Sequence, residues 1–486
     1  MSVDTDNAAF QDALNLIQYT RQSVFLTGKA GTGKSTFLRY VCEHTKKKYV
    51  VLAPTGIAAI NAGGSTMHSF FKLPFYPLLP DDPNLSLQRG RIHEFFKYTK
   101  PHRKLLEQIE LVIIDEISMV RADIIDAIDR ILRVYSHNLR EPFGGKQLLL
   151  VGDVFQLEPV VKNDEREILN RFYPTPYFFS ARVFGQIDLV SIELQKVYRQ
   201  TDPVFVGVLD HIRTNTAGAA DLQLLNTRYG SQIEESEADM YITLATRRDT
   251  VDSINEKKLA ELPGESITFE GVIEGDFPES SLPTSQELVL KPGAQIIFIK
   301  NDFDRRWVNG TIGVIAGIDE EEETIYVITD DGKECDVKRD SWRNIRYRYN
   351  EKTKEIEEEV LGSFTQYPIR LAWAITVHKS QGLTFSRVVI DFTGGVFAGG
   401  QAYVALSRCT SLDGIQLKKP INRADIFVRP EIVNFAGRFN NRQAIDKALK
   451  QAQADVQYAA AARAFNKGDM EECLEQFFRA IHSRYD

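Results

Sequence analysis

Short runs of apolar, β-branched residues recur along the chain, and each ends at Gly, Pro or Asp before a helical pattern begins. Such runs are typical of central strands in a parallel sheet that helices cover on both faces. The first predicted strands are 23–27, 49–53, 111–114 and 147–151, and a second set follows at 241–246, 370–376, 387–392 and 402–406. Two α/β cores in tandem explain this pattern better than one sheet of eight or more strands.

Three stretches interrupt this α/β pattern. Residues 72–104 are rich in Pro, Phe and basic side chains and lie between two strands of the first core. Residues 281–365 show alternating strand patterns with an Asn309-Gly310 turn signal and an acidic run at 319–323, which predict a small inserted antiparallel barrel and a solvated turn. From about residue 435 the chain is rich in Ala and Gln, and the break before Asp469 predicts a helical hairpin whose second helix Asp469 caps.

Composition narrows the class of protein. The chain has 486 residues, 43% of them hydrophobic and 26% charged, which excludes a disordered chain and allows about three domains. With 59 basic against 67 acidic side chains, the net charge is −8, so any nucleic-acid surface must be a local patch.

The cysteines and the apolar runs bear on compartment. Four cysteines stand far apart without a C-x-x-C pair, which argues against a disulfide framework and a zinc cluster. The first ten residues contain no apolar run, and no stretch approaches the ~18 apolar residues of a membrane span. We expect a soluble intracellular protein, cytoplasmic if bacterial.

The sequence GKAGTGKS at 28–35 fits the phosphate-loop pattern and stands between a predicted strand and a helix. The glycines let backbone N–H groups surround phosphates, and the helix N-terminus favours an anion. Lys34 would bridge the β and γ phosphates, and Ser35 would hold Mg²⁺. A flexible glycine turn is the alternative.

Two further strand ends carry polar side chains. The run LVIIDE at 111–116 places Asp115 and Glu116 where open α/β sheets bind ligands. Asp115 would hold the hydrated Mg²⁺, and Glu116 would orient the attacking water, unless it is simply a surface acid that opens a helix. After the strand at 147–151, Gln156 could hydrogen-bond the γ phosphate.

With these residues in place, the chain resembles the Pif-type helicases, the Pif and RecD-like branch of superfamily one, over about residues 7–434. The resemblance rests on motifs in register: GKAGTGKST at 28–36, APTG at 53–56, GSTMHSF at 64–70, DEISM at 115–119, PFGG at 142–145, GD at 152–153 with Gln156, VYRQ at 197–200, TVHKSQG at 376–382 and YVALSR at 403–408.

The resemblance implies a fold and domain boundaries. The expected fold class is α/β, with two tandem RecA-like P-loop NTPase cores, a small inserted β-barrel and a helical C-terminal tail. The first core would span 1–190 with a wedge-like insertion at 63–110, the second 191–434 with the barrel at 281–365, and the tail 435–486.

The resemblance also implies roles for individual residues. Catalytic roles fall on Lys34, Glu116, Gln156, Arg199 and Arg408, the two arginines reaching the γ phosphate from the second core. ATP contacts fall on Gln11, Gly28, Ala30, Gly31, Thr32, Gly33, Lys34, Ser35, Thr36, Gln381 and Gly382, and Mg²⁺ on Ser35 and Asp115. Gln18 is an alternative to Gln11 as the residue that reads adenine.

The implied contacts to DNA come from Thr55, Thr66, His68, Thr376, His378, Lys379 and Ser380. Residues 88–104 add a local charge of +5 with interleaved aromatics, which predicts either a DNA-guiding surface or a solvated face whose aromatics lie in a core. Arg343, Arg346 and Arg348 alternate with apolar residues and would share a sheet face, opposite DNA or the acidic residues 357–359.

The function expected from these patterns is an ATP- and Mg²⁺-dependent DNA helicase that moves 5′ to 3′ on single-stranded DNA and unwinds duplex. Family roles in replication, repair, recombination or telomere and G-quadruplex maintenance follow by resemblance, as does a monomeric motor. An ATP-gated DNA clamp and a P-loop phosphotransferase remain the alternatives. Glu116 argues against a clamp, and a second core with arginines argues against a phosphotransferase.

Overall fold

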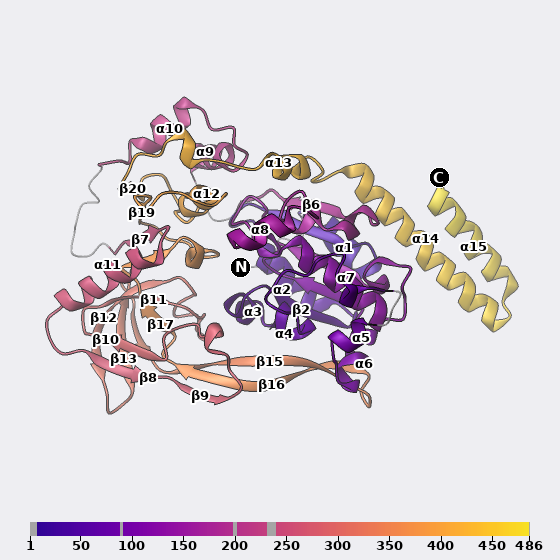
Figure 1. The fold of residues 1–486 in the computed structure, drawn as a ribbon, viewed down its shortest axis with the longest axis horizontal. Coiled ribbons are helices and arrows are strands. Elements are labelled where there is room, and N and C mark those ends of the chain that lie inside the picture. The colour runs from indigo at the N-terminus through magenta and orange to yellow at the C-terminus, as the bar shows by residue number, and fades with distance from the viewer. Residues whose placement is uncertain (1–6, 88–90, 198–201, 231–239, 486) are drawn as a thin grey trace.

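The computed structural model describes residues 7–87, 91–197, 202–230 and 240–485. Two α/β units lie side by side, each built on a parallel sheet, and antiparallel strands lie below the second unit (Figure 1). This mixed α/β architecture agrees with the class that the sequence predicts. We call the part around the first sheet the first unit and the part around the second sheet the second unit.

The first sheet has the order β3-β2-β4-β5-β1-β6, and every neighbouring pair is parallel. Its strands are β1 (Val24–Gly28), β2 (Tyr49–Ala53), β3 (Ser65–Thr66), β4 (Leu111–Ile114), β5 (Gln147–Val151) and β6 (Val190–Leu194). The four strands predicted here are confirmed to within one residue. Strand β6 crosses the boundary expected at residue 190.

Helices cover both faces of this sheet because its strands are apolar on both sides. Leu111 and Ile113 pack in one cluster, and Val112 and Ile114 pack in the cluster on the opposite face, as the two-residue strand period requires. The helices are α1 (Ala8–Tyr19), α2 (Lys34–His44), α3 (Gly56–Ala62), α4 (Met67–Phe71), α5 (Ile92–Phe95), α6 (Lys100–Gln108), α7 (Ala122–Tyr135) and α8 (Asn163–Leu169).

The second sheet has the order β18-β7-β19-β20 and is also parallel. Its strands are β7 (Ile242–Ala245), β18 (Ala374–Thr376), β19 (Val388–Asp391) and β20 (Ile415–Leu417). The helices of this part are α9 (Pro203–Arg213), α10 (Ala219–Asn226), α11 (Arg248–Glu261) and α12 (Gln401–Leu406). Helix α13 (Pro430–Ala436) follows them in the sequence but packs Ile432 and Phe435 in the core of the first unit.

Two of the strand predictions for the second unit are wrong. Residues 402–406 form helix α12 instead of a strand. Gly400 adopts a left-handed φ of 83° at its N-cap, and alanine favours helix, so a five-residue apolar run could not be assigned by pattern alone. Residues 370–376 divide between β17 (Ile369–Leu371), which pairs antiparallel in another sheet, and the parallel β18.

The segment between β7 and β18 forms three antiparallel sheets, with the orders β14-β13-β12-β11-β17, β10-β8 and β15-β16-β9. The strands are β8 (Ile267–Glu270), β9 (Val272–Gly275), β10 (Glu287–Leu290), β11 (Gln295–Phe298), β12 (Ile312–Asp319), β13 (Thr324–Thr329), β14 (Glu334–Val337), β15 (Asp340–Asn350) and β16 (Glu355–Gln366). Residues 320–323 form the expected turn. Asn309-Gly310 also turns, with Thr311 N–H donating to Val308 O at 3.0 Å, but β12 pairs with β11 across a longer loop.

Strands β15 and β16 form a long arm that reaches below the first unit toward α6 (Figure 1). The arm buries Ile345, Tyr347 and Tyr349 in the core of the first unit, and the Tyr347 hydroxyl accepts a hydrogen bond from Val51 N–H at 3.2 Å. Its other face is charged. Arg346 pairs with Glu359 at 2.7 Å and Arg348 with Glu357 at 3.3 Å, so these two arginines have the acidic partners that the sequence offered as one alternative.

The tail forms the expected helical hairpin, α14 (Arg442–Lys467) and α15 (Met470–Tyr485), which extends away from both units (Figure 1). Asp469 Oδ1 accepts from Glu472 N–H at 3.1 Å, which confirms the predicted cap. The start of α14 packs Ile445 and Ala448 on the first unit.

Candidate nucleotide site and nucleic-acid surface

The phosphate loop leaves β1 and enters α2 through backbone shapes that need glycine. Gly33 takes a left-handed φ of 92° at the N-cap of α2, and a Cβ on Gly28 would lie 2.7 Å from Leu194 O. The Lys34 ammonium donates to Gly28 O at 2.7 Å and Lys29 O at 3.0 Å. The loop is therefore formed, with its lysine bound to its own carbonyls.

Asp115 and Glu116 follow β4 beside this loop. Asp115 Oδ1 accepts from Glu116 N–H at 2.9 Å, and Glu116 adopts a left-handed φ of 51°, a strained backbone shape often found at functional sites. Burial, with the Asp115 charge next, raises the pKa of Glu116 to about 7, while Lys34 opposes the shift. Burial likewise raises the pKa of Asp115. The structure thus brings Lys34 and the acidic pair together.

Gln156 lies in the turn that follows β5, and its side chain is buried. Its N–H donates to Asp153 O at 3.0 Å. A Cβ on Gly400 would lie 2.2 Å from Gln156 O, so the start of α12 rests directly on this turn. The second unit therefore contacts the strand end that carries Gln156.

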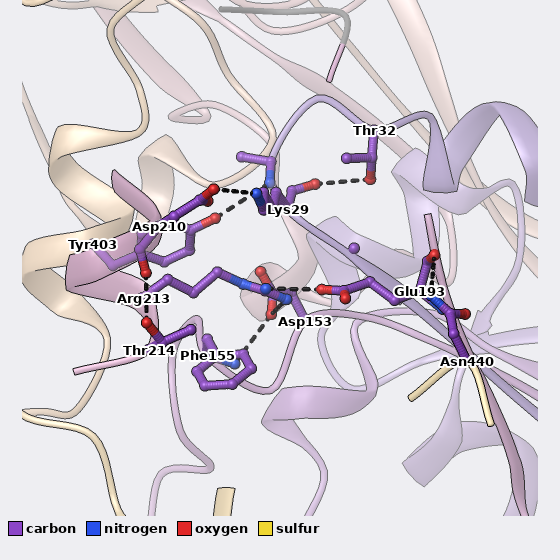
Figure 2. A network of polar contacts seen from close by, with 12 residues as sticks. Lys29, Thr32, Asp153, Phe155, Glu193, Asp210, Arg213, Thr214, Tyr403 and Asn440 are labelled. Atoms are coloured by element: carbon purple, nitrogen blue, oxygen red, sulfur yellow. Dashed lines mark hydrogen bonds and ion pairs between the residues drawn. The ribbon is translucent and has the colours of Figure 1, made fainter. Parts of the chain in front are cut away.

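Further polar contacts join the two units at the phosphate loop (Figure 2). The Lys29 ammonium pairs with Asp210 at 2.5 Å, and Ala30 N–H donates to the Tyr403 hydroxyl at 3.5 Å. Arg213 donates to Glu193 at 2.8 Å and to Asp153 at 3.2 Å. The units are closed against each other along this edge.

Of the two predicted arginines, the structure describes Arg408. Arg199 lies outside the described residues. Arg408 is 1% exposed, and its guanidinium donates to the carbonyls of Val404, Ser380 and Leu383 at 3.0–3.2 Å. Its charge still lowers the pKa of Glu116, which places it near the acidic pair.

The remaining predicted nucleotide residues occupy three places. Gly31, Thr32, Ser35 and Thr36 belong to the loop or the first turn of α2, and Thr32 donates to Lys29 O at 2.9 Å. Gln11 is half-buried in α1, as is the alternative Gln18. In the second unit, Gly382 has a left-handed φ of 77°, and the buried Gln381 Nε2 has no hydrogen-bond partner among the described residues.

Predicted DNA residues of the first unit gather at the ends of β2 and β3. Thr55 caps α3 and Thr66 caps α4, so both hydroxyls accept backbone N–H groups at 3.1–3.2 Å. His68 stacks on Phe75, with ring centroids 5.0 Å apart, and Phe75 is 84% exposed. Phe75 and its exposed neighbour Tyr76 were not predicted as site residues, and no spacing in the sequence marks them as exposed.

Predicted DNA residues of the second unit follow β18. Thr376 Oγ1 accepts from Lys379 N–H at 3.2 Å, Lys379 is exposed and His378 is half-buried. Burial lowers the pKa of His378, which favours its neutral form. Ser380 is buried and donates to Val377 O at 2.7 Å, so its side chain does not join this surface.

The basic insertion separates its charges from its aromatics. Phe96 and Tyr98 are buried in the core of the first unit, and the Tyr98 hydroxyl donates to Phe71 O at 2.5 Å. Lys97 and Lys100 are exposed. The two aromatics therefore have the core role that the sequence offered as the plainer alternative. Arg89 lies outside the described residues.

Sequence reasoning missed three residues of the second unit that contact the first: Asp210, Arg213 and Tyr403. Asp210 and Arg213 lie in α9, where an acid and a base three positions apart look like ordinary surface charges. Tyr403 stood inside a recognised motif, but its segment was assigned as a strand. No pattern in the sequence indicates that these side chains meet the phosphate loop.

Neither a ready-made metal cluster nor a membrane-spanning helix occurs in the part of the chain that the structure describes. No group of three or more His, Cys, Asp or Glu side chains there could hold a metal ion by itself. A site with one carboxylate is what Mg²⁺ uses when phosphates and waters supply its other ligands. Among the described helices, none combines the length and apolar character needed to cross a membrane.

Comparisons with known proteins point to one family. A family model described as PIF1-like helicase matches residues 4–207. The ATP-dependent DNA helicase Pif1 of Bdellovibrio bacteriovorus is 31% identical over 439 residues, which are 88% of this chain and 90% of that protein.

Solved structures of a Bacteroides Pif1 agree. Its crystal structure in complex with ADP-AlF4 is 42% identical and superposes with a TM-score of 0.81, covering 88% of this chain and 96% of that one. The same type of protein bound to ssDNA, at 41% identity, covers 91% and 99% and gives a TM-score of 0.63. The arrangement of this chain is therefore more similar to that nucleotide complex than to that DNA complex.

Proposed function

The chain belongs to the PIF1-like helicase family, and from this premise we infer that it is an ATP-dependent DNA helicase that moves 5′ to 3′ along single-stranded DNA and unwinds duplex. The observation that carries the proposal is the meeting of Lys34, Asp115 and Glu116 at the edge where the second unit closes on the first. A binding clamp would not need a second carboxylate, Glu116, beside the phosphate lysine.

We propose that the two units are RecA-like cores, with the antiparallel strands of 281–365 as a barrel inserted in the second. Support comes from the two parallel sheets and from the contacts of α9 and α12 with the turns that follow β1 and β5. The first core would include β6, and the hairpin 442–485 would be an appended element. Because one chain supplies both units, a single chain would suffice as a motor.

For ATP to bind, the Lys34 ammonium would leave the carbonyls of Gly28 and Lys29 for the β and γ phosphates. Ser35 and Asp115 would hold Mg²⁺, which supplies charge neutralisation on the phosphates. Glu116 would accept a hydrogen bond from the attacking water and orient it in line. Gln156 would donate to the γ phosphate and so report its presence.

Arg408, with Arg199 from outside the described residues, would supply positive charge to the transition state. In this arrangement Arg408 is bonded to carbonyls of its own unit, so it would have to exchange at least one of these bonds for the γ phosphate. Gln381 and Gly382 lie on the same loop as Ser380, whose carbonyl accepts one of those bonds. That loop would therefore move together with Arg408.

The DNA strand would cross the ends of β2 and β3 and then of β18. The exposed Phe75, stacked on His68, offers a face on which a base could stack, a contact worth about 1–3 kcal/mol. Thr55 and Thr66 would present helix N-termini to phosphates, and Lys379 would add charge in the second core. Alternating grip of these two surfaces during ATP hydrolysis would give translocation.

The test is ATPase activity with and without single-stranded DNA, followed by unwinding of duplexes with a 5′ or a 3′ tail and of a tailed G-quadruplex. We expect DNA to stimulate turnover and the 5′-tailed duplex to be opened. High turnover without DNA would favour a phosphotransferase or simple ATPase. DNA binding that depends on ATP, without unwinding of either duplex, would favour the clamp.

A further inference from the structure

Helix α9 presents an acid and a base on one face, and each is paired with the opposite charge on the first unit. Asp210 and Arg213 are three positions apart and so lie on the same side of the helix. Asp210 pairs with Lys29 of the phosphate loop, and Arg213 pairs with Asp153 and Glu193 (Figure 2). One helix of the second unit thereby contacts both the loop and the end of β5.

Arg213 is a buried charge with specific partners. It is 4% exposed, its two terminal nitrogens bind carboxylates from two different strand ends, and its guanidinium lies 4.4 Å from the centre of the Phe155 ring. Burying an ion pair is weak evidence for stability, because desolvation offsets much of the attraction. Arg213 Nε and Asp153 Oδ2 are also buried without partners among the described residues, so the cluster is not optimised for stability alone.

The partners of Arg213 are themselves fixed. Asp153 Oδ1 also accepts from Phe155 N–H at 3.1 Å, and Asp153 O accepts from Gln156 N–H, so Asp153 is hydrogen-bonded to the backbone of the turn that carries Gln156. Glu193 is held from the other side by Asn440, whose side chain bonds both its N–H and its carbonyl at 2.8 and 3.1 Å. Arg213 therefore joins α9 to the segment 153–156 through two carboxylates whose backbones are themselves hydrogen-bonded.

We propose that Arg213 is a positioning residue for ATP hydrolysis: it couples α9 of the second unit to the segment 153–156 and so holds Gln156 where the γ phosphate would lie. The Lys29–Asp210 pair is the second point of attachment, at the phosphate loop itself. This inference rests on the proposed function, because it assumes that Gln156 faces ATP. It adds a residue from α9 to the groups that determine turnover.

The variants are Arg213→Met, which keeps the length without the charge, and Arg213→Lys, which can pair with one carboxylate but not with two in a fork. Arg133→Met is the matched control. Arg133 is 6% exposed and binds Asp129 at 2.9 Å, but the partners of its guanidinium among the described residues all belong to the first unit, and none is part of the phosphate loop or of the segment 153–156. Each variant is assayed for kcat and KM of DNA-stimulated ATP hydrolysis, with melting temperature as a measure of folding.

We expect Arg213→Met to lower kcat by ~10–100-fold, the loss typical when a residue that orients an active group is removed. KM for ATP should stay within about threefold, because the phosphate loop keeps its own contacts, and Arg213→Lys should recover part of the loss. Arg133→Met should lower the melting temperature without lowering kcat of the folded enzyme. Equal kcat losses in Arg213→Met and Arg133→Met would overturn the proposal, as would a raised KM with normal kcat.

If Arg213→Met does not fold, Glu193→Gln provides the second test, because it keeps the shape and removes one charge. A reduced kcat with unchanged KM supports the proposal, and a normal kcat overturns it. Failure of the proposed function is distinguishable: the wild-type protein would then show no DNA-stimulated turnover. Wild-type activity combined with a normal kcat in Arg213→Met rejects only the positioning role.

Discussion

The phosphate-loop edge and the basic insertion 91–104 bury opposite kinds of side chain. At the first, charged and polar groups such as Asp153, Gln156 and Arg213 lie inside, between the two units. At the second, Phe96 and Tyr98 lie inside and the lysines face solvent. Both regions are marked in the sequence by charged residues, but only the first buries them between the two units.

The difference comes from the backbone that presents the charges. A turn after a parallel strand points its side chains into the cleft at the sheet edge, and closure of the second unit then excludes water from them. An amphipathic helix such as α6 turns its charges outward and its apolar side chains inward. A charge at a strand end is therefore stronger evidence for chemistry than a charge on a helix, unless the helix face is buried against the other unit, as that of α9 is at Arg213.

Lys34→Ala should have the largest effect. The variant loses the ammonium that bridges the β and γ phosphates, so ATP turnover should fall at least about 10³-fold while single-strand binding survives. Lys97→Ala, which removes an exposed lysine of the insertion, is the control and should leave ATPase unchanged. ATP turnover assays and measurement of single-strand binding by fluorescence anisotropy test this prediction. Normal turnover in Lys34→Ala would contradict the assignment of the site.

Glu116→Gln should have the second-largest effect on turnover. The amide keeps the size of the side chain but cannot orient water as a base, so kcat should fall by roughly 10²–10⁴-fold. Nucleotide should still bind, because Asp115 and Lys34 remain. Equilibrium binding of a fluorescent ATP analogue beside turnover measures the two effects. Parallel loss of binding and turnover would instead make Glu116 a structural acid of the turn.

The pH dependence of turnover should show a smaller effect, which comes from the phosphate-loop edge alone. Burial raises the pKa of Glu116 to about 7, so the carboxylate is protonated below that pH and cannot act as a base. Activity should therefore fall as pH drops, to about a tenth of its plateau one unit below the pKa. Steady-state kcat at saturating ATP, Mg²⁺ and DNA tests this. Constant kcat between about pH 6 and 8 would show that the group is ionised throughout.

The elements predicted well are those whose pattern is local. Runs such as 111–114 and 147–151 had one interpretation because they are apolar throughout and end in a turn. The run 402–406 is equally apolar but forms a helix, because Gly400 sets a left-handed cap that the pattern does not show. The long arm of β15 and β16 was predicted as part of a barrel, while its contact with the first unit through Tyr347 depends on tertiary structure alone.

The same limit applies to the site. The segments that carry Lys34, Asp115, Glu116 and Gln156 follow the ends of β1, β4 and β5 at recognisable spacings, so their proximity could be predicted from sheet geometry. Asp210 and Arg213 could not, because their partners lie far away in the sequence and only the closure of the two units brings them together. Contacts between units leave no periodic signal in a single sequence.

The smallest expected effect concerns the insertion. Arg91, Lys97 and Lys100 are exposed, and within the described parts of the chain none of them forms an ion pair, so they are available to phosphates. Replacing all three by Gln should leave ATPase on short single strands nearly intact. Unwinding of a tailed duplex should fall a few-fold, and the salt slope should fall by about 0.7–0.9 for each phosphate that the variant no longer neutralises.

The control for that experiment is the arm, where Arg346 and Arg348 are equally basic but already paired with Glu359 and Glu357. Their double replacement by Gln should change neither unwinding nor its salt dependence, because a paired charge has little left to offer DNA and an exposed pair adds only about 0–1 kcal/mol of stability. Unwinding at two salt concentrations, measured beside ATPase, separates the outcomes. Equal losses of unwinding in the two variants would mean that both the insertion and the arm of β15 and β16 contact duplex DNA. Normal unwinding in the insertion variant would make its charges a solvated face that serves only to keep the buried aromatics of the insertion in place.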